Sequence, residues 1–107
     1  MVSLDSWFMG LPDRFDAAAA GDLSAVFYFA VSGAGGGDYT VKVAGGKCEV
    51  TKAKPENPEL TATIADTDMA AIAAGELDPV SAFMAGKLQI DGDIGLAMRI
   101  PDLFLRR

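Results

Sequence analysis

Carboxylates are the side chains of this sequence that come closest to a set of groups for acid–base chemistry. The chain has no histidine and a single cysteine, Cys48, so it cannot form a Ser-His-Asp or a Cys-His arrangement. An enzyme that uses carboxylates alone would need Asp16, Asp38 or Asp93 in a desolvated position beside an apolar substrate. All three fall in predicted caps or loops, which favours a structural role in contact with solvent.

The signals for metal, phosphate and thiol chemistry are equally weak. Asp66-Thr67-Asp68 and Asp91-Gly92-Asp93 lack the ligand number and spacing of a calcium loop and fit helix caps and turns. The glycine-rich stretch 33–37 lies between two predicted strands, so it fits a hairpin connection better than a phosphate loop, which needs a following helix. Cys48 is predicted to face inward on a strand as an inert thiol. We therefore expect no catalytic residue, no bound metal and no cofactor.

The composition excludes further classes of protein. The chain has 107 residues, of which 50% are hydrophobic, and a formal net charge of −6. Its length fits one domain over residues 1–107, and its acidity argues against a nucleic-acid partner. No apolar run approaches the ~20 residues of a membrane span, and the N-terminus lacks the pattern of a signal peptide. From these features we expect a cytoplasmic protein.

The strongest basic cluster contains Lys42, Lys47, Lys52 and Lys54. Lys42 and Lys47 flank a predicted Gly-Gly hairpin turn and would share one side of it. A solvated sheet face is the main interpretation of this cluster, and a weak contact with an anionic lipid head group is the alternative.

Hydrophobic periodicity predicts the elements that must position any site. Apolar residues at three- and four-residue spacing indicate helices, and strict alternation indicates strands. A final helix with an apolar surface around most of its circumference must be buried or must cover apolar material. The predicted order is a helical stretch over 7–20 interrupted near Gly10 and Pro12, strands over 26–31, 39–43, 48–50 and 60–64, short helices over 66–75 and 78–86, a strand over 88–90, and a closing helix over 94–105 kinked or ended near Pro101. This order defines an α+β fold.

Residues 76–99 carry a more specific signal. They read Glu-Leu-Asp-Pro-Val-Ser-Ala-Phe-Met-Ala-Gly-Lys-Leu and then Gln-Ile-Asp-Gly-Asp-Ile-Gly-Leu-Ala-Met-Arg. This block closely resembles the C-terminal signature of the sterol carrier protein two family, which has a Pro-x-Ser-Ala-Phe helix, a Gly-Lys-Leu-x-Ile strand and a Gly-Leu-Ala-Met helix start. Residues 63–68 resemble the strand-to-helix step of the family. Residues 8–15 resemble the N-terminal helix of its bacterial, stand-alone members.

The resemblance implies a fold, a function and a site. The family fold is a five-stranded, mostly antiparallel sheet with helices covering one face and an apolar tunnel between them. The implied function is non-catalytic binding and transfer of a sterol-like lipid, a fatty acid or a fatty acyl-CoA. The expected lipid-binding residues come from the second half of the chain and from inward strand positions, although the sequence leaves open which sheet face is covered. They are Phe29, Val41, Val50, Ile64, Met69, Ile72, Phe83, Met84, Leu88, Ile90, Leu96, Met98, Ile100 and Phe104.

Two other functions stay open at this point. One is an accessory subunit that acts through a protein partner in lipid or quinone metabolism, which an exposed apolar patch around Trp7 and Phe8 would support. The other is a carboxylate-only enzyme on a small lipid, which a buried aspartate with a raised pKa beside the pocket would support. We expect a lipid or fatty acyl ligand, while a transient membrane contact, a protein partner, and a monomer or weak dimer all remain open.

Overall fold

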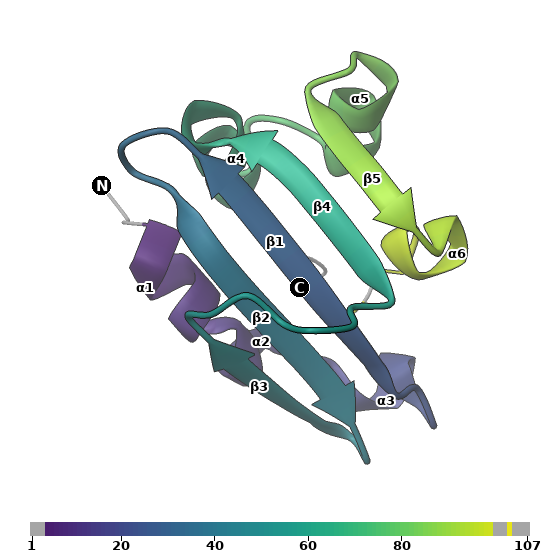
Figure 1. Ribbon diagram of the computed structural model, residues 1–107. Helices are drawn as coiled ribbons and strands as arrows, with labels where there is room; N and C mark the ends of the chain where they lie inside the picture. Colours follow the sequence, from purple (N-terminus) through teal and green to yellow (C-terminus); the bar gives the residue numbers. More distant parts are fainter. Residues whose placement is uncertain (1–3, 100–102, 104–107) are drawn as a thin grey trace.

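The computed structural model describes residues 4–99 and 103 of the chain, which form a mixed sheet with helices on one face (Figure 1). The strands are β1 (Ala25–Ser32), β2 (Gly37–Ala44), β3 (Lys47–Thr51), β4 (Leu60–Ala65) and β5 (Leu88–Gly92). They lie in the order β3-β2-β1-β4-β5. Only the β1–β4 pair is parallel, and the other pairs are antiparallel. The predicted five-stranded, mostly antiparallel α+β fold is confirmed.

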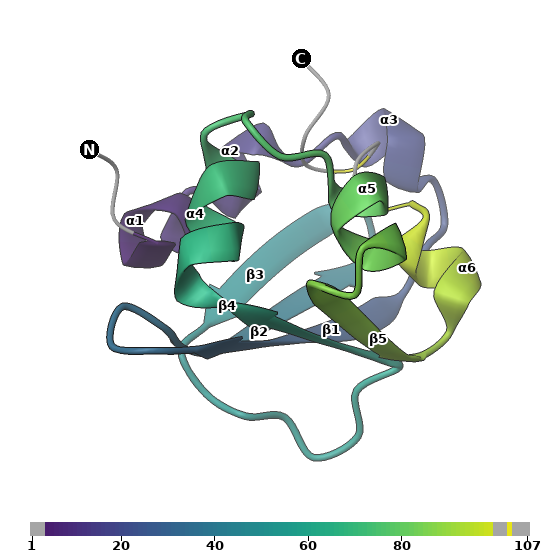
Figure 2. The ribbon, with the colours of Figure 1, turned by 90° about the horizontal axis from the view of Figure 1, so that it is seen from above.

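The helices are short and gather on one side of the sheet (Figure 2). They are α1 (Leu4–Met9), α2 (Leu11–Arg14), α3 (Ala17–Ala20), α4 (Asp66–Ala73), α5 (Pro79–Met84) and α6 (Ile94–Ala97). Helices α1 and α2 contact β3. Helix α4 contacts β4 and β1, α5 contacts β5, and α6 contacts both β4 and β5. The helical layer is therefore divided between the two halves of the sheet. Among the described residues, no helix has both the length and the apolar character needed to cross a membrane.

Strand alternation decides which side chains face the helices. Phe27, Phe29 and Val31 of β1 are buried on the helical side, as are Val41 and Val43 of β2, which pair with β1 in register. The opposite face is polar: the Tyr28 hydroxyl donates a hydrogen bond to Asp38 over 2.6 Å. Figure 2 shows the connection from β3 to β4 running along that second face, where the Thr40 hydroxyl donates to the Ala53 carbonyl over 2.6 Å. Lys42 is exposed on the same face opposite Glu49, which agrees with the solvated interpretation of the basic cluster.

An aromatic cluster fixes α1 on the sheet. The rings of Phe8 and Tyr39 stack at 4.1 Å, Phe8 also contacts Phe29 at 5.4 Å, and Trp7 meets Phe8 edge-on at 5.2 Å. Trp7 is only 6% exposed and Phe8 is 0% exposed. Trp7 and Phe8 therefore do not themselves form the exposed apolar patch that would support an accessory subunit, although the neighbouring Met9 is 47% exposed.

The closing segment, predicted as a helix over 94–105 kinked or ended near Pro101, is described over residues 94–99 and at Leu103, whose N–H donates to the Arg99 carbonyl at 3.1 Å. Helix α6 ends at Ala97, and the Arg99 N–H bonds to the Leu96 carbonyl at 3.0 Å in a tighter, three-residue turn. Two of the expected site residues, Ile100 and Phe104, lie outside the described residues. Leu103 is described and is almost completely buried in the core.

Candidate functional site

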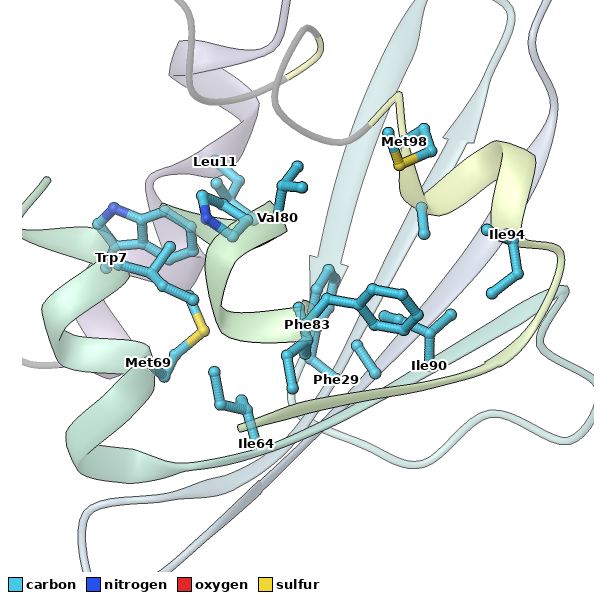
Figure 3. A pocket seen from close by; sticks show the side chains of 15 residues that line it. Trp7, Leu11, Phe29, Ile64, Met69, Val80, Phe83, Ile90, Ile94 and Met98 are labelled. Atoms are coloured by element: carbon cyan, nitrogen blue, oxygen red, sulfur yellow. The ribbon is translucent and has the colours of Figure 1, made fainter. Parts of the chain in front are cut away.

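An apolar pocket lies between the sheet and the helices that cover β4 and β5. Figure 3 shows the 15 side chains that line it. The sheet contributes Phe29, Ala62, Ile64, Leu88 and Ile90. The helices and the residue after α6 contribute Trp7, Leu11, Met69, Ile72, Pro79, Val80, Phe83, Ile94, Ala97 and Met98. The space not occupied by atoms is about 850 Å³, including the part that is open to solvent.

The floor of the pocket follows from strand register. Phe29 of β1 lies opposite Ala62 of β4, and Ala62 in turn lies opposite Ile90 of β5. These residues share one face of the sheet because side chains directly opposite each other on neighbouring strands point the same way. Because Ala62 is small and lies between the larger Phe29 and Ile90, it leaves free space above β4.

Helix α5 supplies one wall, and its sequence explains its orientation. The Asp78 carboxylate accepts a hydrogen bond from the Ser81 N–H over 3.0 Å, and Pro79 occupies the first helical turn, where no intrahelical N–H is lost. Val80 and Phe83 are three residues apart and therefore lie on one side of the helix. Ala82 is completely buried, and its small size allows α5 to lie close to the rest of the core.

The pocket is open at the end lined by Phe83, Ile94 and Met98, which are 41%, 47% and 59% exposed. At the other end Trp7 and Leu11 are 6% and 1% exposed, but Val80, which lies beside Leu11, is 42% exposed. Figure 3 shows Trp7 and Leu11 on one side of the pocket and Ile94 and Met98 on the other. Among the described residues, the pocket is therefore exposed along both α5 and α6.

The part of the wall formed by described residues carries no ionisable group that could act as an acid, a base or a nucleophile. None of the lining residues is charged, and among the described residues no charged side chain is buried. Asp16, Asp38 and Asp93 are all exposed, so the aspartate that a carboxylate-only enzyme would need beside the pocket is not found among them. The described part of the chain also brings together no group of three or more potential metal ligands. The arrangement can bind an apolar molecule by removing it from water.

The structure brings most of the expected site residues together in this pocket. Those that line it are Phe29, Ile64, Met69, Ile72, Phe83, Leu88, Ile90 and Met98.

Four described residues of the expected set do not line the pocket. Val41 and Val50 face the helical side, but they belong to the half of the sheet beneath α1 and α2. Met84 is 79% exposed, because it follows Phe83 and points away from the inner side of α5. Leu96 packs against the core from α6 without reaching the pocket wall.

Several residues that line the pocket were not expected from the sequence. Val80 and Ala62 could have been found, since Val80 lies one helical turn before Phe83 and Ala62 shares a strand face with Ile64. Trp7 and Leu11 gave no such signal, because they reach the pocket only through packing between distant parts of the chain. The remaining missed residues are Pro79, Ile94 and Ala97.

These features define a class of protein: a small α+β domain that holds an apolar pocket between a mixed sheet and one layer of helices. The chain belongs to the SCP-2 sterol transfer family, whose model matches residues 8–105.

A relative supports the family, and solved structures show the same fold. The sterol carrier protein 2 of Oryctolagus cuniculus is 38% identical over 87 residues, which is 78% of this chain but only 16% of that protein. The sterol carrier protein 2 like 2 of Aedes aegypti has a TM-score of 0.76 with 23% identity, covering 94% of both chains. The sec-alkylsulfatase Pisa1 of Pseudomonas sp. contains the same fold, with a TM-score of 0.82 and 19% identity over 96% of this chain and 16% of that one.

Proposed function

We propose that this chain binds a hydrophobic lipid in the pocket and carries it without catalysing a reaction on it. The observation that supports this most directly is the pocket wall, in which 15 side chains from eight helices and strands or their ends present no charged group. The similarity to sterol carrier proteins supports a sterol-like lipid as the ligand, and the apolar wall would also accept the hydrocarbon chain of a fatty acid or a fatty acyl-CoA.

Transfer from water into such a pocket supplies the binding energy. Each methylene group moved out of water contributes about 0.8 kcal/mol, so about 12 buried methylenes contribute roughly 10 kcal/mol before the cost of ordering the ligand is subtracted. An apolar wall distinguishes poorly between neighbouring chain lengths. The protein would therefore accept a range of lipids.

Binding can be tested on the intact chain. Native mass spectrometry of the purified protein should show a retained lipid, and titration with a pyrene-labelled fatty alcohol should give saturable fluorescence at micromolar concentrations. A protein that retains no lipid and does not bind the probe would contradict the proposal. A transient contact with a membrane would bring the open end of the pocket, with Phe83, Ile94 and Met98, close to a lipid source.

An accessory role through a protein partner is the second candidate. The observation that favours it is the exposed apolar surface of α5 and α6, which includes Val80 and Met84. The matched region is also only 16% of the rabbit relative, so this kind of domain occurs beside other domains. A protein that stays a monodisperse monomer, binds lipid and captures no partner from its own source would count against this role.

A further inference from the structure

The described pocket wall contains two thioethers, Met69 and Met98, and they differ in their access to water. Met69 of α4 is 5% exposed, whereas Met98, directly after α6, is 59% exposed. Figure 3 shows Met98 near Ile94, on the side of the pocket away from Met69 and Trp7. We propose that Met98 is a modification site, at which oxidation of the sulfur by hydrogen peroxide lowers the affinity of the pocket for its ligand. This inference rests on the proposed lipid-binding function and adds a means of releasing the ligand.

The oxidation converts a thioether into a sulfoxide. The Met98 sulfur attacks one oxygen of the peroxide, and an S–O bond forms as the O–O bond breaks. The second oxygen leaves as hydroxide and becomes water by taking up the proton of the first. The sulfur loses two electrons, which the peroxide gains. The product is a polar side chain in place of a flexible apolar one, and methionine sulfoxide reductases can reduce it back.

The described wall around Met98 offers no hydrogen bond to the new oxygen. The described lining residues have apolar side chains apart from Trp7, whose indole lies on the other side of the pocket in Figure 3. The backbone N–H groups of Ala97, Met98 and Arg99 already donate to carbonyls of α6 or of its N-cap residue. Because a buried sulfoxide oxygen without a hydrogen bond is unfavourable, the oxidised side chain turns from the pocket towards water.

The backbone of Met98 is held in place, so only its side chain can respond to oxidation. The Met98 N–H donates to the Ile94 carbonyl at 3.1 Å. The guanidinium of the next residue, Arg99, donates to the carbonyls of Ala19 and Ala20 at 2.9 and 3.3 Å. Rotation of the oxidised side chain out of the pocket therefore uncovers ligand surface that Met98 had covered. Withdrawing the equivalent of about one methylene from apolar contact weakens binding about fourfold.

Two other exposed methionines provide internal comparisons. Met9 and Met84 are 47% and 79% exposed, and neither lines the pocket. An aqueous oxidant must reach the sulfur to react with it, so peroxide should modify Met9, Met84 and Met98, whereas the buried Met69 should react much more slowly. A bound ligand covers the inward side of Met98 and should slow the reaction there, but it should not slow the reaction at Met9 or Met84.

Tryptic peptide mapping by mass spectrometry follows the oxidation site by site, because Met98 is the one methionine of the peptide 88–99. The full delipidated chain is treated with dilute hydrogen peroxide, either empty or saturated with pyrene-labelled dodecanol. The peroxide is then removed, and the affinity of the empty sample for the probe is measured by fluorescence titration. We expect the ligand to slow the oxidation of Met98 severalfold and to leave that of Met84 unchanged. The oxidised protein should bind the probe about fourfold more weakly than the untreated protein.

Two results would overturn the inference and leave the proposed function intact. One is equal protection of Met84 and Met98 by the ligand. The other is an unchanged affinity once the peptide 88–99 is fully oxidised. If the untreated protein does not bind the probe, the inference and the proposed function both fail.

Three variants assign the loss of affinity to one sulfur. In Met98→Leu the pocket keeps an apolar side chain that peroxide does not oxidise, so the ratio of the affinities before and after treatment should stay near one. Met84→Leu, outside the pocket, should show the same loss as the parent protein. A loss in Met98→Leu as large as in the parent would mean that another oxidised residue or unfolding causes it, and would refute the role of Met98. Met98→Gln introduces a polar group without oxidation and should bind the probe more weakly than Met98→Leu, so equal affinities of these two variants would also contradict the inference.

Discussion

Arg99 donates a hydrogen bond from its guanidinium Nη2 to the backbone carbonyl of Ala19 over 2.9 Å, across 80 positions of the sequence. A second bond from the same nitrogen reaches the Ala20 carbonyl at 3.3 Å. Both carbonyls lie at the end of α3, beyond the reach of the helix's own N–H groups, and the Ala20 carbonyl also accepts from the Leu23 N–H at 2.9 Å. Because Arg99 directly follows Met98, this contact also fixes the wall of the pocket at its open end.

Replacing Arg99 should therefore destabilise the fold. In Arg99→Met the apolar part of the side chain is retained, but two charge-assisted hydrogen bonds to half-buried carbonyls are lost, which should lower the free energy of unfolding by about 1–2 kcal/mol. Urea unfolding followed by circular dichroism measures this change. The matched control is Lys87→Met at an exposed position, which should change stability by less than about 0.5 kcal/mol. Equal effects of the two substitutions would show that the Arg99 contacts contribute nothing.

The glycine-rich connection between β1 and β2 should tolerate substitution very unevenly. The Gly35 N–H donates to the Asp66 carboxylate over 2.9 Å, and a Cβ atom added at Gly36 would overlap the carbonyl oxygen of Val31. A Cβ at Gly37 would instead make an ordinary contact with the Tyr39 ring at 3.7 Å.

Gly36→Ala is therefore expected to lower the free energy of unfolding by about 2 kcal/mol or more, because the backbone must move to accept the methyl group. Gly37→Ala should change it by less than about 0.5 kcal/mol. Denaturant unfolding of the two variants in parallel compares them. If both are tolerated equally, the connection is looser at Gly36 than its contact with the Val31 carbonyl implies.

The sequence was informative about strands and helices because their patterns are local. Ile64, Leu88 and Ile90 were correctly expected to share an inward face, since alternation along β4 and β5 fixes their direction. The same alternation also turned Val41 inward, but it could not show that α1 and α2 rather than the pocket cover that half of the sheet. Trp7 reaches the pocket through packing between segments that are distant in sequence, and no spacing rule anticipates such a contact. Whether an inward-facing residue belongs to the core or to the pocket therefore depends on which helices cover its half of the sheet.

Filling the pocket should reduce lipid binding without unfolding the protein. Ile90→Trp places a large ring on the pocket floor beside Ala62, so we expect the affinity for a pyrene-labelled fatty alcohol to fall by about tenfold or more, since several methylenes of the ligand would lose their place. Met84→Trp adds the same ring at a side chain that is 79% exposed and outside the pocket wall, so it should leave binding within about twofold.

Fluorescence titration and thermal unfolding of both variants separate binding from stability. Loss of binding in both variants would place part of the ligand outside the pocket described above. A parallel loss of binding and stability in Ile90→Trp alone would favour a plain core over a ligand cavity at this position.

The Cys48 thiol should react slowly in the native protein. Burial, with a smaller contribution from the Glu49 carboxylate, raises its pKa from 9.0 to about 11, and only the thiolate is nucleophilic. At about pH 8.5, iodoacetamide should therefore modify the native protein about a hundredfold more slowly than the urea-unfolded chain. Mass spectrometry of timed samples measures the two rates. Similar rates would mean that Cys48 becomes exposed readily in the native state.

The same pKa shift predicts how stability depends on pH. The thiol stays protonated in the folded state up to about pH 11, whereas it ionises near 9.0 in the unfolded chain. The unfolded state therefore releases its proton first, so the stabilisation is fully present below pH 9.0 and is lost as the pH rises towards about 11. Cys48→Ala removes this contribution. The difference in urea midpoint between the parent protein and Cys48→Ala should therefore be constant below pH 9. Above pH 9 the urea midpoint of the parent protein should fall relative to that of Cys48→Ala. The tyrosines and lysines titrate in both proteins, so they do not change this difference in urea midpoint. A difference that stays constant up to pH 11 would show that the Cys48 thiol ionises equally in the folded and unfolded states.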